Sequence, residues 1–416
     1  MSTDTAVSGT GQATVAERRG HRTAKYALIL GGLTAFGPLS VDMYLPALPT
    51  MTQDLHSTDT ALQLTLAAFI VGLGVGQLVV GPLSDAWGRR RPLLVGIAVF
   101  VVASVLCAVS PSAEALIAAR TLQAFGAAAG VVIARAAVRD LYSGIAMARF
   151  FSMLMLVTGL APILAPVIGG QLLAVTSWRG IFWALTGFGV LLLTVAAFAL
   201  PEPLPPSRRR PARFGPVMRT YGGLLSDRLF LGYALAVGMA FAGMFAYISG
   251  SSFVLQGVYG LSPVEYSIVF GVNGFGLVAA SQVNGRIVAR FRQRSLLLTG
   301  LLATLAGALG MVAAAVFGLG LAGLLPPLFV LVSSIGLIMP NATSLALADH
   351  PHTAGSASAL LGVVQFLVGG AASPLVGAFG EGSAVPMATI MAVTGMLALV
   401  SFGVLTRRHS TTPRPA

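Results

Sequence analysis

The sequence predicts an all-α integral membrane protein that crosses the bilayer twelve times. Of its 416 residues, 56% are hydrophobic and only 9% are charged, and the mean hydropathy is +0.86. A soluble domain carries about a quarter charged residues, so this chain has too little polar surface to cover a globule in water. The apolar residues also form twelve runs, each close to the length of about 20 residues that a helix needs to cross the hydrocarbon core.

The twelve predicted spans are separated by short segments rich in polar residues, glycine or proline. They cover residues 26–48, 60–82, 92–110, 113–135, 147–174, 180–200, 229–256, 263–285, 295–318, 320–347, 354–378 and 384–406. TALQ at 60–63 and SPVE at 262–265 match the capping box, in which the first and fourth side chains satisfy free N–H groups at a helix start. Both segments therefore predict where a helix begins.

One long linker divides the spans into two sets of six. It covers 201–228 and begins PEPLPPSRRRP. We therefore expect an N-terminal six-helix bundle at 26–200 and a C-terminal one at 229–406, with a disordered tail at 1–25 and a short tail at 407–416. Weak repetition between the halves indicates pseudo-symmetric copies, an arrangement typical of transporters.

The arginines predict which end of the protein faces the cytoplasm. An even number of spans places both termini on one side, and that side receives almost all of the arginines, whereas the opposite side receives only Arg179. Basic residues concentrate in cytoplasmic loops, so we expect both tails in the cytoplasm. The net charge of +12 then reflects membrane topology, not nucleic-acid binding. The single cysteine, Cys107, lies in an apolar run and is expected to pack in the core.

Two charged residues inside spans are candidates for function, because a charge at the bilayer centre costs about 2.5–3.5 kcal/mol even on a lenient scale. Asp42 lies in the first span and Arg120 in the fourth, at similar predicted depths, with Gln123 one turn from Arg120 on the same face. We expect Asp42 to take up and release protons while it contacts a substrate, in a water-filled cavity shared with Arg120. The alternatives are a static ion pair that fixes helix register, or an Asp42 that reaches the membrane interface.

Aromatic, methionine and amide side chains inside the spans could line an adaptable apolar pocket. Each is also compatible with ordinary packing or with a hydrogen bond between helices. The possible cavity residues are Phe36, Met43, Tyr44, Phe245, Tyr247, Asn273, Asn341 and Gln365.

Several motifs resemble those of one transporter family. GPLSDAWGRRRP at 81–92 resembles motif A of the major facilitator superfamily, AARTLQAFGAAAG at 118–130 its fourth-span motif, and GLAPILAPVIGG at 159–170 its fifth-span antiporter motif. Three more segments are similar to the Bcr/CflA drug-resistance subfamily. They are LSVDMYLPALP at 39–49, IARAAVRDLY at 133–142 and PNATSLALADHPHTAGSASALLG at 340–362.

This resemblance implies two six-helix bundles and proton-driven export of small hydrophobic or amphipathic drugs across the bacterial inner membrane. The implied substrates are of the chloramphenicol/florfenicol, bicyclomycin or sulfonamide class. Asp42 falls on the family's first-span carboxylate and Arg120 on its fourth-span arginine. Two departures are Ala86, where an arginine usually follows the motif A aspartate, and Thr34, which is acidic in some relatives. A single first-span carboxylate favours a one-proton cycle.

Motif A is expected to form a cytoplasmic gate. Asp85 should face the N-terminus of the eleventh span near residues 353–356, because a helix dipole favours a carboxylate there. That contact would form only when the two halves close on this side. The predicted gate residues are Gly81, Asp85, Gly88, Arg89 and Arg90, with Arg135 and Arg139 as further partners of Asp85.

The antiporter motif is expected to form a bent helix that packs closely against the second half around Pro374, since prolines kink helices and glycines let backbones approach. Its residues are Gly159, Pro162, Pro166, Gly169 and Gly170.

Other classes of protein fit the sequence less well. A proton-coupled metabolite importer on the same fold is the alternative, although sugar carriers usually need more polar side chains in the cavity. HExxH, an intramembrane Ser/His pair and an aspartate dyad are absent, so we expect no enzyme, no cofactor and no metal site. His350 and His352 are expected in a solvated turn. The expected partners are a small-molecule drug, protons and membrane lipids, with no nucleic acid, and the chain is expected to be a monomer.

Overall fold

The computed structural model describes residues 26, 28–142, 144–209, 214–350, 353–378 and 382–406. The predicted tails at 1–25 and 407–416 lie outside the described residues. All regular secondary structure in the described part is helical, and twelve helices there are long and apolar enough to cross a membrane. The predicted all-α membrane architecture is therefore confirmed, and the span boundaries agree within a few residues.

The first span, Leu28–Asp54, is discontinuous. It consists of a helix over residues 28–42, a 3-10 turn at Leu45–Ala47 and the short helix α2 (Leu48–Asp54). The helices of the first half that follow are α3 (Asp59–Trp87), α4 (Arg90–Ala108), α5 (Ala113–Leu141), α6 (Gly144–Val175) and α7 (Trp178–Ala199).

The second half contains six further spans, and its first helix ends in a π-helical turn at Phe253–Val258. Its helices are α9 (Arg228–Ser252), α10 (Pro263–Ile287), α11 (Gln293–Val316), α12 (Gly320–Leu347), α13 (Ala354–Ala378) and α14 (Val385–Leu405). The predicted linker contains an additional helix, α8 (Phe214–Ser226), which packs against α9 and α13.

One of the two predicted capping boxes is present. Ser262 accepts from the backbone N–H of Glu265, whose carboxylate accepts from the N–H of Ser262. The prediction at TALQ is wrong by two residues, because α3 begins at Asp59 and the hydroxyl of Thr58 accepts from the N–H of Ala61. The amide of Gln63, which the motif assigned to the cap, points to the other half of the molecule.

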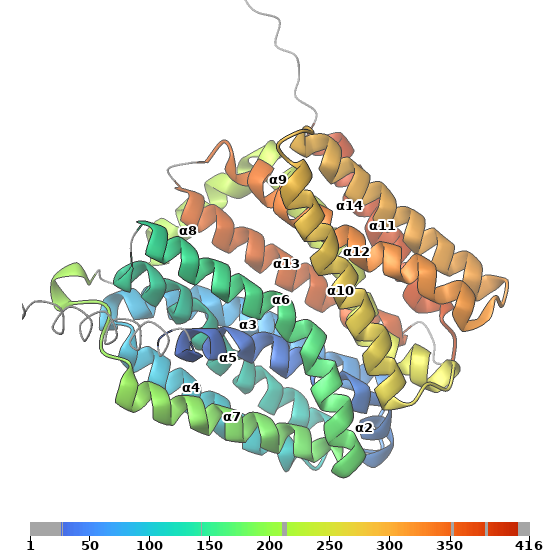
Figure 1. Cartoon of the computed structure of the whole chain (residues 1–416), viewed down its shortest axis with the longest axis horizontal. Helices are drawn as coiled ribbons and strands as arrows, with labels where there is room; N and C mark the ends of the chain where they lie inside the picture. Colours follow the sequence, from blue (N-terminus) through green and yellow to red (C-terminus); the bar gives the residue numbers. More distant parts are fainter. Residues whose placement is uncertain are drawn as a thin grey trace, which may run out of the picture.

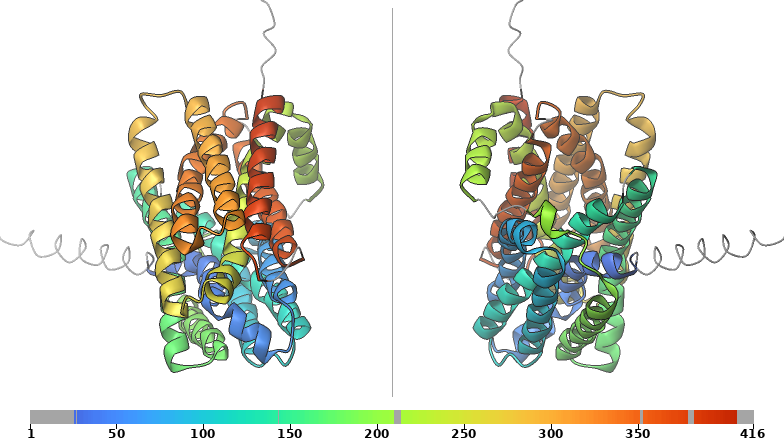
Figure 2. Two further views of the ribbon diagram at one scale, coloured as in Figure 1. Left: turned by 90° about the vertical axis from the view of Figure 1, so that its right-hand side faces the viewer. Right: turned by 90° about the vertical axis from the view of Figure 1, so that its left-hand side faces the viewer.

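The two halves form separate bundles, seen as the blue-to-green and yellow-to-red groups of helices in Figure 1 and from the sides in Figure 2. In the first bundle α5 packs against α3 and α4; in the second, α9 packs against α13 and α14. The bundles meet through α3 against α13 and through α6 against α10.

The expected packing of the antiporter motif around Pro374 is wrong. The kinked helix α6 packs instead on α10, where Ile163 lies over Gly274 and Gly170 faces Ser267. Pro374 belongs to α13, which covers α3. Glycine on both helices of the α6–α10 pair allows their close approach.

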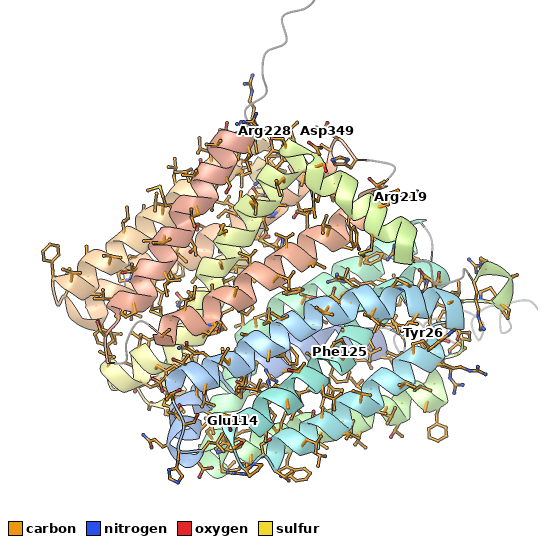
Figure 3. All side chains as sticks on the ribbon, turned by 180° about the vertical axis from the view of Figure 1, so that it is seen from behind. Tyr26, Glu114, Phe125, Arg219, Arg228 and Asp349 are labelled. Carbon is orange, nitrogen blue, oxygen red and sulfur yellow. The ribbon has the colours of Figure 1, made fainter. Side chains whose placement is uncertain are left out.

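The two ends of the molecule are distinguished by the segments that lie there. We call the end that carries residues 201–209 and α8 the linker end and the opposite end, where α2 lies, the far end. Figure 3 shows Tyr26 and Arg219 at the linker end and Glu114 at the far end. Apolar side chains fill each bundle, and Cys107 is buried among them, as expected.

Glycines set how closely the helices of a bundle pack, and Gly126 on α5 gives a test. A Cβ there would lie 2.6 Å from the backbone nitrogen of Phe100 and 2.7 Å from the carbonyl oxygen of Gly96. Because backbone atoms cannot move aside cheaply, we expect Gly126→Ala to destabilise the protein by about 1–3 kcal/mol. Thermal unfolding of the purified protein in detergent measures this. Gly187→Ala is the control, because nothing lies within 4 Å of its Cβ; equal effects of both changes would contradict the argument.

Candidate functional site

The first span is interrupted directly after Asp42. Helical structure ends at this residue, Met43 and Tyr44 form a turn, and the 3-10 helix follows. The break packs against α6, where a Cβ on Gly169 would overlap the carbonyl oxygen of Met43. This position therefore requires glycine. Discontinuous spans in carriers place irregular backbone at binding sites, so the break is the centre of the candidate site.

Asp42 is buried, with the residue only 4% exposed. Its carboxyl group lies within electrostatic range of the phenols of Tyr247 on α9 and Tyr266 on α10, both in the second bundle. The amide of Asn273 donates to the hydroxyl of Tyr247 at 3.0 Å, and the hydroxyls of Tyr266 and Ser251 lie 3.2 Å apart. One carboxyl group of the first bundle thus meets a hydrogen-bonded group of the second.

Arg120 lies inside the first bundle and is completely buried. Its guanidinium carbon is 4.5 Å from the ring centre of Tyr44 and 4.2 Å from that of Phe69, and its Nη1 donates to Gln123 at 2.6 Å. The amide of Gln123 in turn donates to Ser104 at 2.8 Å. The remaining nitrogens, Nε and Nη2, are buried without a hydrogen-bond partner.

The structure therefore does not pair Asp42 with Arg120. Ion pairs in the described part of the chain include those of Arg89, Arg179 and His350. The expectation of one shared cavity differs from the observed geometry because the break turns the chain between Asp42 and Tyr44. Tyr44 covers Arg120 within the first bundle, whereas Asp42 lies within electrostatic range of Tyr247 and Tyr266 in the second.

The predicted cavity residues lie in different surroundings. Phe36 stacks on Phe100 at 4.2 Å inside the first bundle, and Asn341 donates to Asn284 at 2.6 Å between α12 and α10. Both contacts are packing interactions, the alternative that the sequence left open. The rest of the set is nearly buried as well: Met43, Tyr44, Phe245, Tyr247, Asn273 and Gln365. Sequence reasoning missed Tyr266, because the adjoining SPVE motif at 262–265 was used only to locate a helix start.

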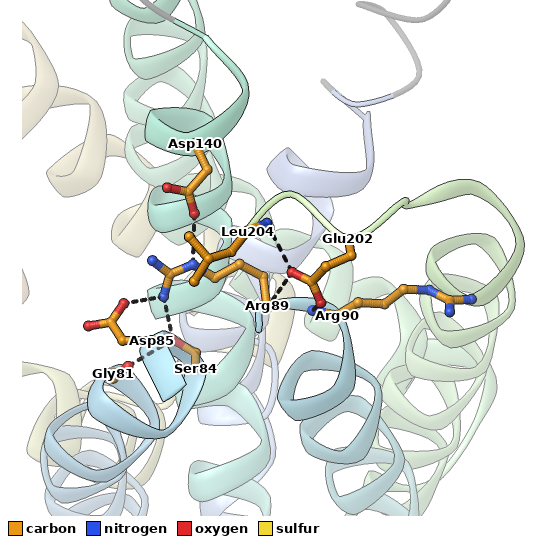
Figure 4. A network of polar contacts seen from close by, with 8 residues as sticks. All are labelled: Gly81, Ser84, Asp85, Arg89, Arg90, Asp140, Glu202 and Leu204. Carbon is orange, nitrogen blue, oxygen red and sulfur yellow. Dashed lines mark hydrogen bonds and ion pairs between the residues drawn. The ribbon is translucent and has the colours of Figure 1, made fainter. Parts of the chain in front are cut away.

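Motif A forms a network of polar contacts at the linker end (Figure 4). Arg89 donates to Asp140 at 2.8 Å and to Ser84 at 2.7 Å, and its Nη1 lies 2.6 Å from a carboxylate oxygen of Asp85. Asp85 is therefore paired within its own bundle, and its side chain is 53% exposed. Among the described residues, its ion-pair partner is Arg89 and neither of the expected arginines, Arg135 and Arg139.

Glu202 of the linker completes this network. Its carboxylate accepts the backbone N–H of Arg89 at 2.7 Å, of Arg90 at 3.1 Å and of Leu204 at 3.0 Å. An acidic group is stabilised at a helix N-terminus, where it satisfies free N–H groups of α4. Gly88 has φ of +88°, and a Cβ there would lie 2.5 Å from Glu202. Glu202 and Asp140 were missed in the sequence, where only motif A and the arginines were considered.

A second polar contact at the linker end corrects an expectation. Nε2 of His350 lies 2.8 Å from Oδ2 of Asp227, and both side chains are partly buried. The turn that holds His350 is therefore fixed to the start of α9 and is not simply solvated. His352 lies outside the described residues.

At the far end, hydrogen bonds connect the two bundles. Ser252 donates to the carbonyl of Leu45 at 2.6 Å, and Gln256 donates to that of Pro46 at 3.1 Å, so the irregular first span is held by α9 and its π-helical turn. Ser267 of α10 donates to Pro166 of α6 at 2.8 Å. Gln63 on α3 also hydrogen-bonds across this boundary, to residues of α13.

This arrangement of bundles and motifs can be compared with known proteins. The sequence matches the family described as Major Facilitator Superfamily over residues 30–374. The chain belongs to this family. It is 43% identical over 385 residues to the Uncharacterized MFS-type transporter YdgK of Bacillus subtilis, with 92% of this chain and 96% of that protein covered.

Relatives in the family include proteins named for drug resistance. Multidrug resistance protein D of Escherichia coli is 30% identical over 95% of this chain and 99% of its own length. The Chloramphenicol resistance protein of Pseudomonas aeruginosa is 30% identical over 83% of this chain and 81% of its own. The predicted resemblance to the Bcr/CflA drug-resistance transporters is confirmed, and the protein is a multi-pass protein of the bacterial inner membrane.

Solved structures agree on the fold. A bacterial homolog of the human lysosomal transporter Spinster superposes with a TM-score of 0.72 at 15% identity, covering 92% of this chain and 95% of that one. The xylose transporter XylE of E. coli gives 0.71 at 13% identity, covering 91% and 97%. At these identities the likeness concerns the fold alone.

The environment of Arg120 generates a prediction for stability. A lysine ammonium cannot contact the two rings and Gln123 at once, because it lacks the planar fork of a guanidinium. We expect Arg120→Lys to lower stability by about 1–3 kcal/mol, measured by thermal unfolding in detergent. Arg286→Lys, at an exposed arginine, is the control. Unchanged stability of Arg120→Lys would show that only the positive charge matters.

Proposed function

We propose that this transporter exports small hydrophobic or amphipathic drugs in exchange for protons. The substrates we propose are of the chloramphenicol/florfenicol, bicyclomycin or sulfonamide class; two relatives are named for bicyclomycin and for chloramphenicol resistance. The observation that carries the proposal is the position of Asp42, a buried carboxyl group at the break of the first span, within electrostatic range of two phenols of the second bundle. Intramembrane carboxyl groups are characteristic of proton and substrate pathways.

The coupling follows from alternating access. The proton affinity of a carboxyl group depends on its exposure to water and on neighbouring polar groups. Asp42 belongs to one bundle, whereas Tyr247 and Tyr266 belong to the other, so rocking of the bundles changes both factors for the same carboxyl group. Protons and drug then bind and leave at opposite faces of the membrane. The protein works as a carrier and not as an enzyme.

We propose that the linker end is cytoplasmic, as the arginines indicate, and that residues 26–200 and 229–406 rock as two units joined by 201–228. The hydrogen bonds at the far end support a conformation closed toward the periplasm. When the linker end closes, Asp85 leaves its exposed pair with Arg89 and binds the N-terminus of α13 as a latch. The chain acts as a monomer in this scheme, since each bundle supplies one side of the site.

Asp42→Asn tests the coupling. The amide cannot release a proton in the physiological range, so we expect at least a tenfold loss of drug-induced proton movement in inside-out vesicles, reported by a pH-sensitive dye. The drugs should include chloramphenicol, bicyclomycin and a sulfonamide, with and without an uncoupler. Asp54→Asn is the matched control, because its carboxylate is paired with Arg179 and Trp178 at the far end.

Two results would contradict the proposal. Drug-dependent proton movement retained by Asp42→Asn would remove this residue from coupling. Drug accumulation, instead of extrusion, in intact cells that carry the native protein would make the chain an importer. Equal protein levels in the membrane are required for both comparisons.

Asp85→Asn tests the latch. Charge at a helix N-terminus contributes about 0.3–1 kcal/mol at exposed sites and up to about 2 kcal/mol when partly buried. We therefore expect turnover to fall about three- to tenfold while drug affinity changes less than about twofold, because Asp85 lies far from Asp42. Asp140→Asn is the control, since it also removes a carboxylate from Arg89. If both variants behaved alike, the effect would come from Arg89 and not from the latch.

A further inference from the structure

Gln63 on α3 is nearly completely buried, with 1% of its surface exposed, at the far end of the boundary between the bundles. Its Oε1 accepts the backbone N–H of Gly377 in the last turn of α13 at 2.8 Å. The backbone carbonyl oxygen of Gln63 accepts from the hydroxyl of Ser373, also on α13, at 3.2 Å. One residue of the first bundle therefore holds two positions of the second.

The fit around this contact depends on Gly377. A Cβ there would lie 2.6 Å from the hydroxyl oxygen of Thr60, 2.8 Å from Oε1 of Gln63 and 2.9 Å from the Cα of Thr60. The last of these contacts is with backbone, so the helices could not stay this close if residue 377 carried a side chain. Glutamine at 63 and glycine at 377 thus act together.

The contact has the properties of a gate. It crosses the boundary between bundles, so it must break when the far end opens. A net contribution of roughly 1 kcal/mol for a neutral hydrogen bond is small enough to be reversed in each cycle. A cavity of about 230 Å³ lies beside it, lined among others by Thr52, Gln63, Val376 and Gly377. Water there can replace the amide partner when the helices separate.

We infer that Gln63 is the far-end gate residue of this transporter, locking α3 to α13 through Gly377 and releasing α13 when the far end opens. Gln63 belongs to the first bundle, unlike the other side chains whose hydrogen bonds connect the two bundles at this end. Ser252, Gln256 and Ser267 belong to the second bundle and donate to carbonyl groups of the first. The inference requires that the bundles change their relative position; it depends neither on proton coupling nor on the identity of the drug.

The test uses a single reporter cysteine in the full-length, purified protein in detergent, where the orientation in a membrane does not matter. Cys107→Ser removes the only native cysteine, and Val376→Cys adds a thiol at a residue that is 5% exposed and lines the cavity. We expect Gln63→Leu to raise the rate of maleimide labelling about three- to tenfold, from the loss of one hydrogen bond. Gln63→Glu keeps an acceptor oxygen and should label close to the parent rate.

Gln53→Leu is the matched control, because Gln53 lines the same cavity but is exposed; its labelling rate should stay at the parent value. Native Cys107, left in place without the reporter, detects unfolding, since it is buried and should remain unlabelled. If Gln63→Leu unfolds by this criterion, Gly377→Ala replaces it as the test, because it separates the same helices. Gly377→Ala should then raise the labelling rate of the reporter cysteine about three- to tenfold. The inference would be overturned if Gln63→Leu, or Gly377→Ala in its place, labelled at the parent rate. It would also be overturned if Gln53→Leu or Gln63→Glu raised the labelling rate as much as Gln63→Leu does.

Discussion

The break in the first span is the constraint on which the rest of the structure depends. In hydrocarbon, every backbone N–H and C=O group needs a partner, and irregular backbone is tolerated only where protein or a water-filled cavity covers it. The carbonyls of Leu45 and Pro46 find their partners in Ser252 and Gln256 of the second bundle. The carbonyl of Leu45 also accepts the backbone N–H of Leu48, so closing the far end adds second-bundle partners to the break and links the environment of Asp42 to the position of the bundles.

The break also separates the polar surroundings of Asp42 from those of Arg120, which an uninterrupted helix would have placed together. Tyr44 covers Arg120 in the first bundle, where the guanidinium is held by aromatic rings and Gln123. Asp42 lies within electrostatic range of Tyr247 and Tyr266 in the second bundle. Arg120 thus supports the internal packing of one bundle, whereas Asp42 is the group that relative movement of the bundles can affect.

Local patterns could be predicted from the sequence, and long-range partners could not. Apolar runs determine the spans because each helix must cover the hydrocarbon by itself, and SPVE determines a helix start because its partners are three residues apart. The depth of a residue along a span also follows from the local sequence, which placed Asp42 and Arg120 at similar depths. The direction of a side chain around the break does not follow from the local sequence, so the two residues were expected to share one cavity. The partner of Arg89 in the linker, Glu202, lies 113 residues away, and the partner of Gln63 lies on another bundle.

The two ends use different chemistry, with different consequences for transport. At the linker end, Arg89 is held by charged groups within one bundle and by the linker, in contacts that reach the surface and are sensitive to salt and to anionic lipid. At the far end, amide and hydroxyl groups join the bundles through neutral hydrogen bonds, each contributing about 0.5–1.5 kcal/mol. A few such bonds can hold the bundles together and still break at low cost, whereas a desolvated ion pair left half-broken would impose a larger barrier. The contacts between the bundles at the far end are neutral, and the charged contacts of Arg89 lie within one bundle and the linker. This distribution is compatible with rapid opening at the far end.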